Sequence, residues 1–257
     1  MTNGIKMKPM PVWTALLFFA VPSAVASFGI YVGMQHFNRA GMNEMVNLLL
    51  TMVLPLALML FASIAAYRIE GNRFSKDAFS ARFRLKRMKG TDWLLTVGLL
   101  VFMAVSYRLL SFTAQWLITY PLFEPPEFLL PAVDPRVAPT GSMTEFMGVP
   151  LLGSWWIAFV YFFVALGFNI FGEEFWWRGY ILPRQELALG RWAWVVHGVL
   201  WCLFHIFWKW NLLMLLPTCL AVSYVAQRTK NTWPGIIVHY IFNSIPLIAI
   251  VRGIAGV

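Results

Sequence analysis

Residues 151–182 read LLGSWWIAFVYFFVALGFNIFGEEFWWRGYIL, and this stretch decides the fold class. It is long enough to cross a bilayer, for which a helix needs about 20 mainly apolar residues. Its charges are confined to Glu173, Glu174 and Arg178. An ionisable group at membrane depth costs about 2.5–3.5 kcal/mol on insertion scales. The stretch therefore indicates a membrane helix whose charged residues are kept for a function.

The composition of the whole chain points the same way. Of the 257 residues, 60% are hydrophobic and 12% are charged, whereas about 25% are charged in ordinary globular domains. The net charge of +9 does not indicate a nucleic-acid partner, because the lysines and arginines gather in short loops between apolar runs. We expect the lipid bilayer as a partner. Cys202 and Cys219 lie within apolar runs and are expected to be buried thiols.

Apolar runs recur along the chain and predict an all-α, polytopic transmembrane helix bundle with about seven spans. The first run continues past Ala24-Val25-Ala26, which resembles a signal-peptidase site, so an uncleaved anchor is expected. The expected spans are Val12–Met34, Val46–Tyr67, Asp92–Ile118, Leu151–Leu182, Ala193–Phe207, Leu212–Ala226 and Ile236–Val251.

The loops predict the orientation and the domain organisation. Arg68–Thr91 holds eight Lys/Arg and two acidic residues, and short positive loops stay in the cytoplasm. This places the N-terminus in the cytoplasm, and we expect a bacterial inner membrane. Tyr120–Pro150 is rich in proline and acidic residues and is expected to be external. It separates the N-terminal transmembrane helices (1–150) from a C-terminal catalytic bundle (151–257).

Polar residues recur at a similar depth in three of the expected spans. At a helical rise of 1.5 Å per residue, Glu173, His205, His239 and Asn243 lie roughly 9–18 Å below the cytoplasmic surface. Three helices thus present polar groups in one slab of the membrane. Sequence alone does not show that these faces meet.

The helical phase separates the roles of the two glutamates. Glu174 and Arg178 are four residues apart, so they share a face and can form an ion pair. Glu173 is offset by about 100° and remains available for proton transfer. His239 and Asn243 also share a face, where they can donate to a developing oxyanion.

Three motifs, Glu173-Glu174-x3-Arg178, Trp201-x3-His205 and His239-x3-Asn243, resemble those of the CPBP intramembrane proteases in order and spacing. That family includes the type II CAAX prenyl endopeptidases and bacterial Abi or bacteriocin-immunity proteins. The resemblance covers Gly153–Val251. Trp201 stands where phenylalanine is more usual in the family, a position that needs an aromatic body.

The resemblance implies an intramembrane endopeptidase acting on a membrane-associated peptide or protein near the cytoplasmic face. Glu173 and His205 would activate a water molecule. His239 and Asn243 would stabilise the oxyanion, while Glu174 and Arg178 would hold the geometry of the site.

Metal dependence stays open, because the family has been described both as metalloproteases and as metal-independent glutamate proteases. A zinc ion would be held by Glu173, His205 and His239. These come from three helices and no His-Glu-x-x-His occurs, so we favour a reaction without a metal or other cofactor.

Two other functions remain as alternatives. One is a non-catalytic membrane partner or bacteriocin-immunity-type scaffold that uses the polar cluster for binding. The other is a small transporter, since buried carboxylates and histidines also form proton relays. The sequence does not identify the substrate, the cleavage site or the oligomeric state.

Overall fold

The computed structural model describes residues 7–130, 133–137 and 143–257. Helices make up most of these residues, and the described strands are one short antiparallel pair, β1 (Glu145–Phe146) and β2 (Val149–Pro150). The all-α prediction is confirmed. Residues 1–6 of the N-terminal leader and parts of the external loop predicted over Tyr120–Pro150 lie outside the described residues.

The N-terminal half forms three long helices. Polar side chains begin two of its helical elements: Asn43 accepts hydrogen bonds from the backbone N–H groups of Met45 and Val46, and Ser75 accepts one from Ala78. Wider, π-type turns interrupt the first two long helices at Gly29–Met34 and Leu49–Val53. The α-helical elements are α1 (Val12–Phe28), α2 (Gln35–Arg39), α3 (Glu44–Leu48), α4 (Leu54–Ile69), α5 (Lys76–Arg82) and α6 (Gly90–Leu117), followed by a 3-10 turn at Pro121–Phe123.

In the C-terminal half, one helix runs without a break from α7 through α9 and widens at Val160–Ala165 and Phe175–Ile181. Gly190 ends it in a positive-φ conformation (φ 56°) that glycine adopts at low cost. The elements are α7 (Trp155–Phe159), α8 (Leu166–Glu174), α9 (Leu182–Leu189), α10 (Ala193–Phe204), α11 (Leu212–Thr229), α12 (Trp233–Asn243) and α13 (Ile245–Ala255), with 3-10 turns at Gly190–Trp192 and His205–Asn211.

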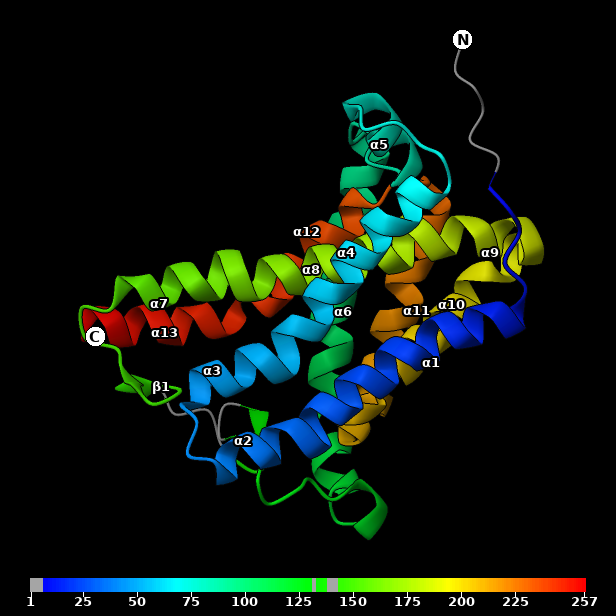
Figure 1. Ribbon diagram of the computed structural model, residues 1–257. Coiled ribbons are helices and arrows are strands. Elements are labelled where there is room, and N and C mark those ends of the chain that lie inside the picture. The colour runs from blue at the N-terminus through cyan, green and yellow to red at the C-terminus, as the bar shows by residue number, and fades with distance from the viewer. Residues whose placement is uncertain (1–6, 131–132, 138–142) are drawn as a thin grey trace.

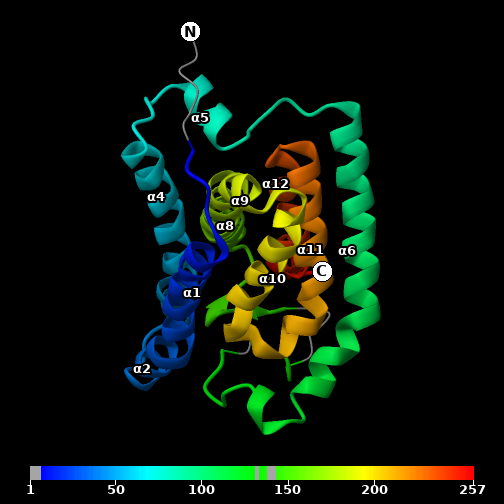
Figure 2. The same ribbon diagram turned by 90° about the vertical axis from the view of Figure 1, so that its right-hand side faces the viewer.

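The N-terminal helices flank the C-terminal ones. Figure 1 shows the α7–α9 helix running across the molecule, with α13 beside α7. In Figure 2 the same helix is seen nearly end-on, between α4 on one side and α11, α12 and α6 on the other. Helix α1 packs on α10, α4 packs on α8, and α6 packs on α11 and α12. One hydrophobic core extends from Met10 to Val238 and joins both halves.

The outer surface suits a lipid environment, since large apolar side chains of α6 such as Leu94, Leu109 and Phe112 are exposed. Within the described residues, four helical stretches are long and apolar enough to cross a membrane: Val12–Arg39, Glu44–Ile69, Gly90–Leu117 and Trp155–Thr229. Helices α12 and α13, bent by 42°, make a fifth if they form one span. The fourth stretch contains three predicted spans and is kinked at Trp208, so the number seven stays a prediction.

A close backbone crossing sets the position of α8 against α4. A Cβ atom at Gly172 would lie 2.2 Å from the carbonyl oxygen of Leu56, a distance that real Cβ atoms essentially never show. Glycine is therefore required for the two helices to approach this closely. Because Gly172 precedes Glu173, the crossing also determines where the Glu-Glu motif lies.

The basic loop between α4 and α6 is fastened to the same helix. The buried Arg82 donates from Nε and Nη2 to the two carboxylate oxygens of Glu70, at 2.6 and 2.9 Å, and from Nη1 to the carbonyl oxygen of Gly179 at 2.8 Å. The ring of Phe83 stacks on that of Phe175 with centroids 5.0 Å apart. This loop, predicted to fix the topology, thus also braces the helix that carries Glu173.

Candidate active site

Two indole groups hold the carboxylate of Glu173. Glu173 lies near the end of α8 and is buried. Its Oε2 atom accepts hydrogen bonds from Nε1 of Trp201, at 2.7 Å, and from Nε1 of Trp177, at 3.3 Å. The bonds come from neutral donors, so they orient the carboxylate without cancelling its charge.

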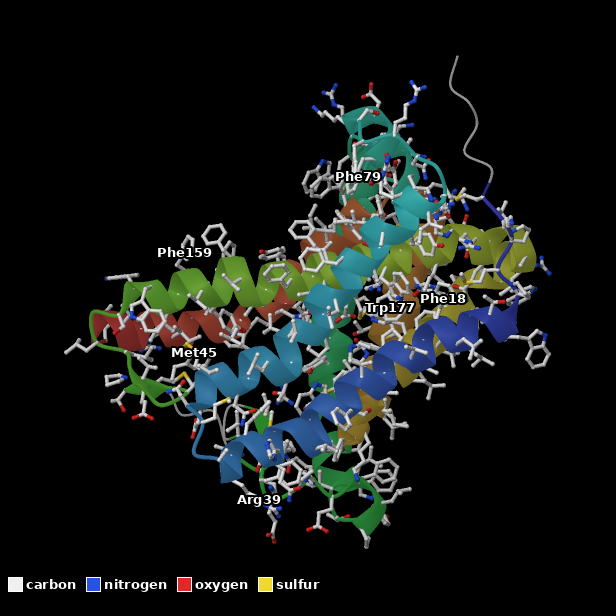
Figure 3. All side chains as sticks on the ribbon, in the orientation of Figure 1. Phe18, Arg39, Met45, Phe79, Phe159 and Trp177 are labelled. Carbon is white, nitrogen blue, oxygen red and sulfur yellow. The ribbon has the colours of Figure 1, made fainter. Side chains whose placement is uncertain are left out.

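Helix α1 supports one of these donors. The ring of Phe19 stacks on Trp177 with centroids 4.2 Å apart and planes inclined by 4°. The neighbouring Trp176 donates from Nε1 to the carbonyl oxygen of Phe18 at 3.4 Å. Figure 3 labels Phe18 and Trp177 where α1 passes the long C-terminal helix.

His205 follows α10 directly and faces Glu173. Its Nδ1 lies 2.9 Å from the carbonyl oxygen of Trp201. A carbonyl oxygen can only accept, so Nδ1 carries a hydrogen and, in the neutral ring, Nε2 is an acceptor. Nε2 lies 3.9 Å from Oε2 of Glu173. This distance is too long for a direct hydrogen bond but suits two groups that bind the same small molecule between them.

Glu174 connects two helices through one oxygen. Its Oε1 lies 2.9 Å from Nη2 of Arg178, and both side chains are fully buried. The spacing of four residues predicts this ion pair. The same oxygen lies 3.1 Å from Nδ1 of His239, which comes from α12. Glu174 therefore also fixes the ring of His239, whose Nε2 atom has no hydrogen-bond partner among the residues that the structure describes.

Trp201 lies at the centre of these groups. The guanidinium carbon of Arg178 stands 3.4 Å from the centroid of its ring, a geometry that gives a cation–π attraction. The ring of His239 lies with its centroid 6.0 Å away, inclined by 70°. The structure thus gathers Glu173, Glu174, Arg178, His205 and His239 around one indole.

Asn243 is placed differently. It is the last residue of α12, one turn after His239, and its backbone carbonyl oxygen accepts a hydrogen bond from the Tyr161 hydroxyl at 2.9 Å. Its side chain is half-buried and forms no hydrogen bond to any residue that the structure describes. The structure therefore brings together five of the six predicted site residues and leaves the amide of Asn243 at the edge.

The model of one protein family, described as type II CAAX prenyl endopeptidase Rce1-like, matches residues 154–245. This segment holds all three motifs and the gathered side chains. Residues 154–245 are thus similar to the Rce1-like family. No curated protein and no solved structure matched the chain. Together with the apolar helices, the match supports an integral membrane protein of the CAAX-type intramembrane protease class.

The arrangement of these side chains bears on the zinc alternative. Within residues 7–130, 133–137 and 143–257, no group of three or more His, Cys, Asp or Glu side chains is placed to hold a metal ion. The two indole N–H groups point at Oε2 of Glu173, the atom nearest His205. Donors directed at that oxygen compete with a cation for it, which disfavours a zinc ion bound by Oε2 of Glu173 together with His205 and His239.

The sequence analysis missed two features of the Rce1-like site. It gave Trp201 the role of an aromatic body, but a buried indole N–H also needs an acceptor, which was the available signal. It also passed over Gly235, the third residue of α12. A Cβ atom there would lie 2.4 Å from Oε2 of Glu174. No pattern along the chain marks this contact, because it joins two distant segments.

Proposed function

We propose that this Rce1-like protein is an intramembrane endopeptidase that hydrolyses a peptide bond of a membrane-associated peptide or protein near the cytoplasmic face. The observation that carries the proposal is the separation of 3.9 Å between Oε2 of Glu173 and Nε2 of His205. Both atoms are acceptors when Glu173 is ionised and His205 is neutral. A water molecule has two hydrogens and can donate one to each.

Glu173 acts as the general base. It takes one proton from the water as the water oxygen forms a bond to the substrate carbonyl carbon. That proton then passes to the nitrogen of the leaving amine as the carbon–nitrogen bond breaks. His205 orients the water through Nε2, because its Nδ1 hydrogen is held by the backbone of Trp201. Positioned proton transfer of this kind contributes about 10²–10⁴-fold in rate.

His239 and Asn243 stabilise the oxyanion. Donors aimed at the developing charge are worth the most in a site that excludes water. Glu174 holds Nδ1 of His239 and so fixes the orientation of the ring. Nε2 of His239 donates to the oxyanion when it carries a hydrogen. The half-buried amide of Asn243 supplies a second donor one helical turn away. Glu174 and Arg178 act together as the structural support of these groups.

The reaction needs no metal or other cofactor, and the lipid bilayer and the substrate are the partners of the protein. The basic segment Arg68–Thr91 keeps its side of the molecule in the cytoplasm, together with the N-terminus. The N-terminal helices of residues 1–150 and the protease core of residues 151–257 are embedded in a bacterial inner membrane.

The test compares membrane peptides from cells that express the wild type, the Glu173→Gln variant or the Glu124→Gln variant. Glu124 is exposed and far from the motifs in sequence, so its variant is the matched control. We expect Glu173→Gln to abolish the release of at least one peptide fragment, with thermal unfolding unchanged, and Glu124→Gln to leave the release intact. If folded Glu173→Gln released the same fragments, the scaffold alternative would replace the hydrolase.

A further inference from the structure

Trp201 contacts more of the site than any role as an aromatic filler requires. Its indole N–H donates to Glu173 at 2.7 Å, its backbone carbonyl accepts from His205 at 2.9 Å, and its ring lies under the guanidinium group of Arg178 at 3.4 Å. A phenylalanine in its place would keep the ring and the carbonyl. It would lose the donor.

The stacked guanidinium strengthens this donor. A cation over an aromatic face draws electron density from the ring, which makes the N–H group a better donor to a carboxylate. Arg178 itself pairs with Glu174, at 2.9 Å, rather than with Glu173. The positive charge of Arg178 can thus act on Glu173 through the indole of Trp201. Arg178 forms its ion pair with Glu174, so the carboxylate of Glu173 stays available as a base.

The second indole does not replace the first. Trp177 donates to the same oxygen, but at 3.3 Å rather than 2.7 Å, and hydrogen bonds weaken as they lengthen. Both indole N–H groups donate to the same atom, so the Glu173 side chain is held through its Oε2 atom alone. The two hydrogen bonds thereby fix the orientation of Oε2 of Glu173 relative to Nε2 of His205.

From these contacts we propose that Trp201 is a positioning residue, whose N–H group holds the carboxylate of Glu173 toward His205 and relays the charge of Arg178 to it. The proposal rests on the endopeptidase function proposed above. A first test, which does not depend on activity, labels the indole nitrogens with ¹⁵N and records the spectrum of the purified protein in micelles. Trp201→Phe and Trp177→Phe variants assign the two signals by their disappearance.

The spectrum should show Trp201 with the most deshielded indole proton, followed by Trp177. The chain has 13 tryptophans. Glu173→Gln should shift the indole signals of Trp201 and Trp177 and leave most of the other indole signals unchanged. If the indole N–H signal of Trp201 had the same chemical shift in Glu173→Gln as in the wild type, the proposal would be overturned, whether or not the protein cleaves any peptide.

A second test measures turnover of a fluorogenic farnesylated CAAX peptide in proteoliposomes. We expect kcat to fall roughly 10- to 100-fold in Trp201→Phe, the range for one hydrogen bond to a charged group, with KM changed less than about threefold. Site-specific benzothienylalanine at 201, which replaces N–H by sulfur in a ring of the same shape, should behave like phenylalanine. Trp177→Phe should lose less, and Trp210→Phe, a buried control outside the site, should match the wild type.

The outcomes separate the two proposals. Full turnover with benzothienylalanine at 201, or equal losses of kcat in Trp201→Phe and Trp210→Phe, would overturn the positioning role while leaving the hydrolase in place. If the wild type leaves the farnesylated peptide uncleaved, this substrate is wrong for the enzyme. The positioning role is then decided by the response of the indole signals.

Discussion

Glu174 and His239 are 65 positions apart in the chain, yet Oε1 of the carboxylate and Nδ1 of the imidazole lie 3.1 Å apart. The same oxygen lies 2.9 Å from Arg178. One carboxylate oxygen therefore joins the long helix α7–α9 to α12 and sets the orientation of a histidine on the opposite side of the site. The second glutamate of the motif is a junction between helices, and it leaves the first glutamate for chemistry.

Removing the charge of Glu174 should cost both stability and activity. Glu174→Gln would leave the fully buried Arg178 without its counter-ion, and breaking a buried pair in this way costs about 3–5 kcal/mol. We expect a clear drop in the midpoint of thermal unfolding in micelles, and a lower kcat because His239 loses its charged partner. Glu124→Gln serves as the exposed control. An unchanged midpoint in Glu174→Gln would contradict a stabilising role of the Glu174–Arg178 ion pair.

Gly235 should tolerate no side chain. In Gly235→Ala the new Cβ would lie 2.4 Å from Oε2 of Glu174, so the carboxylate must move away from Arg178 or His239. A misplacement of about 1 Å can cost roughly 10²-fold in rate, and we expect a loss of this size in kcat.

The matched control is Gly98→Ala, because Gly98 lies on the exposed side of α6 and a Cβ there meets nothing within 4 Å. This variant should keep full activity. Equal activity of the two variants would show that the carboxylate of Glu174 has room to shift without consequence.

Arg82 should be needed for the rigidity of the catalytic helix. A lysine at this position cannot reproduce the planar fork that binds both oxygens of Glu70 and the carbonyl oxygen of Gly179. We expect Arg82→Lys to lower the free energy of unfolding by about 1–3 kcal/mol, the cost of a buried donor or acceptor left unpaired. Arg73→Lys, at an exposed position of the same loop, should be neutral in the same denaturation experiment.

Activity should not depend on a divalent metal. Two indole donors already occupy Oε2 of Glu173, the carboxylate oxygen that lies 3.9 Å from His205. Prolonged dialysis against 1,10-phenanthroline, followed by turnover measurements, should leave kcat unchanged, and added zinc should not raise it. Loss of turnover that zinc restores would refute the metal-free reaction.

Local spacing predicted what one helix determines by itself. A separation of four residues predicts the contact between Glu174 and Arg178, and the structure has it at 2.9 Å. The offset of Glu173 from that pair is also visible in the sequence. Apolar length predicted the all-α fold, because a helix satisfies its own backbone in lipid.

The rotation of one helix against another could not be read in this way. Equal depth made a meeting of Glu173 and His205 plausible, and the structure places them 3.9 Å apart. The same reasoning placed His239 and Asn243 on one face of a helix but did not foresee the contact of the His239 ring with Glu174. Turns of π type, such as Phe175–Ile181 after the Glu-Glu motif, change the helical phase locally and have no simple signature in the sequence.

The stacking of Phe19 on Trp177 has a consequence for any attempt to trim this enzyme. The match to the family model begins at residue 154, so a fragment that contains only the C-terminal helices could be expressed by itself. Such a fragment would lack the phenylalanine ring against which one of the two indoles that donate to Glu173 is stacked. The first helix thus supports the candidate site, because it packs against the tryptophans beside Glu173.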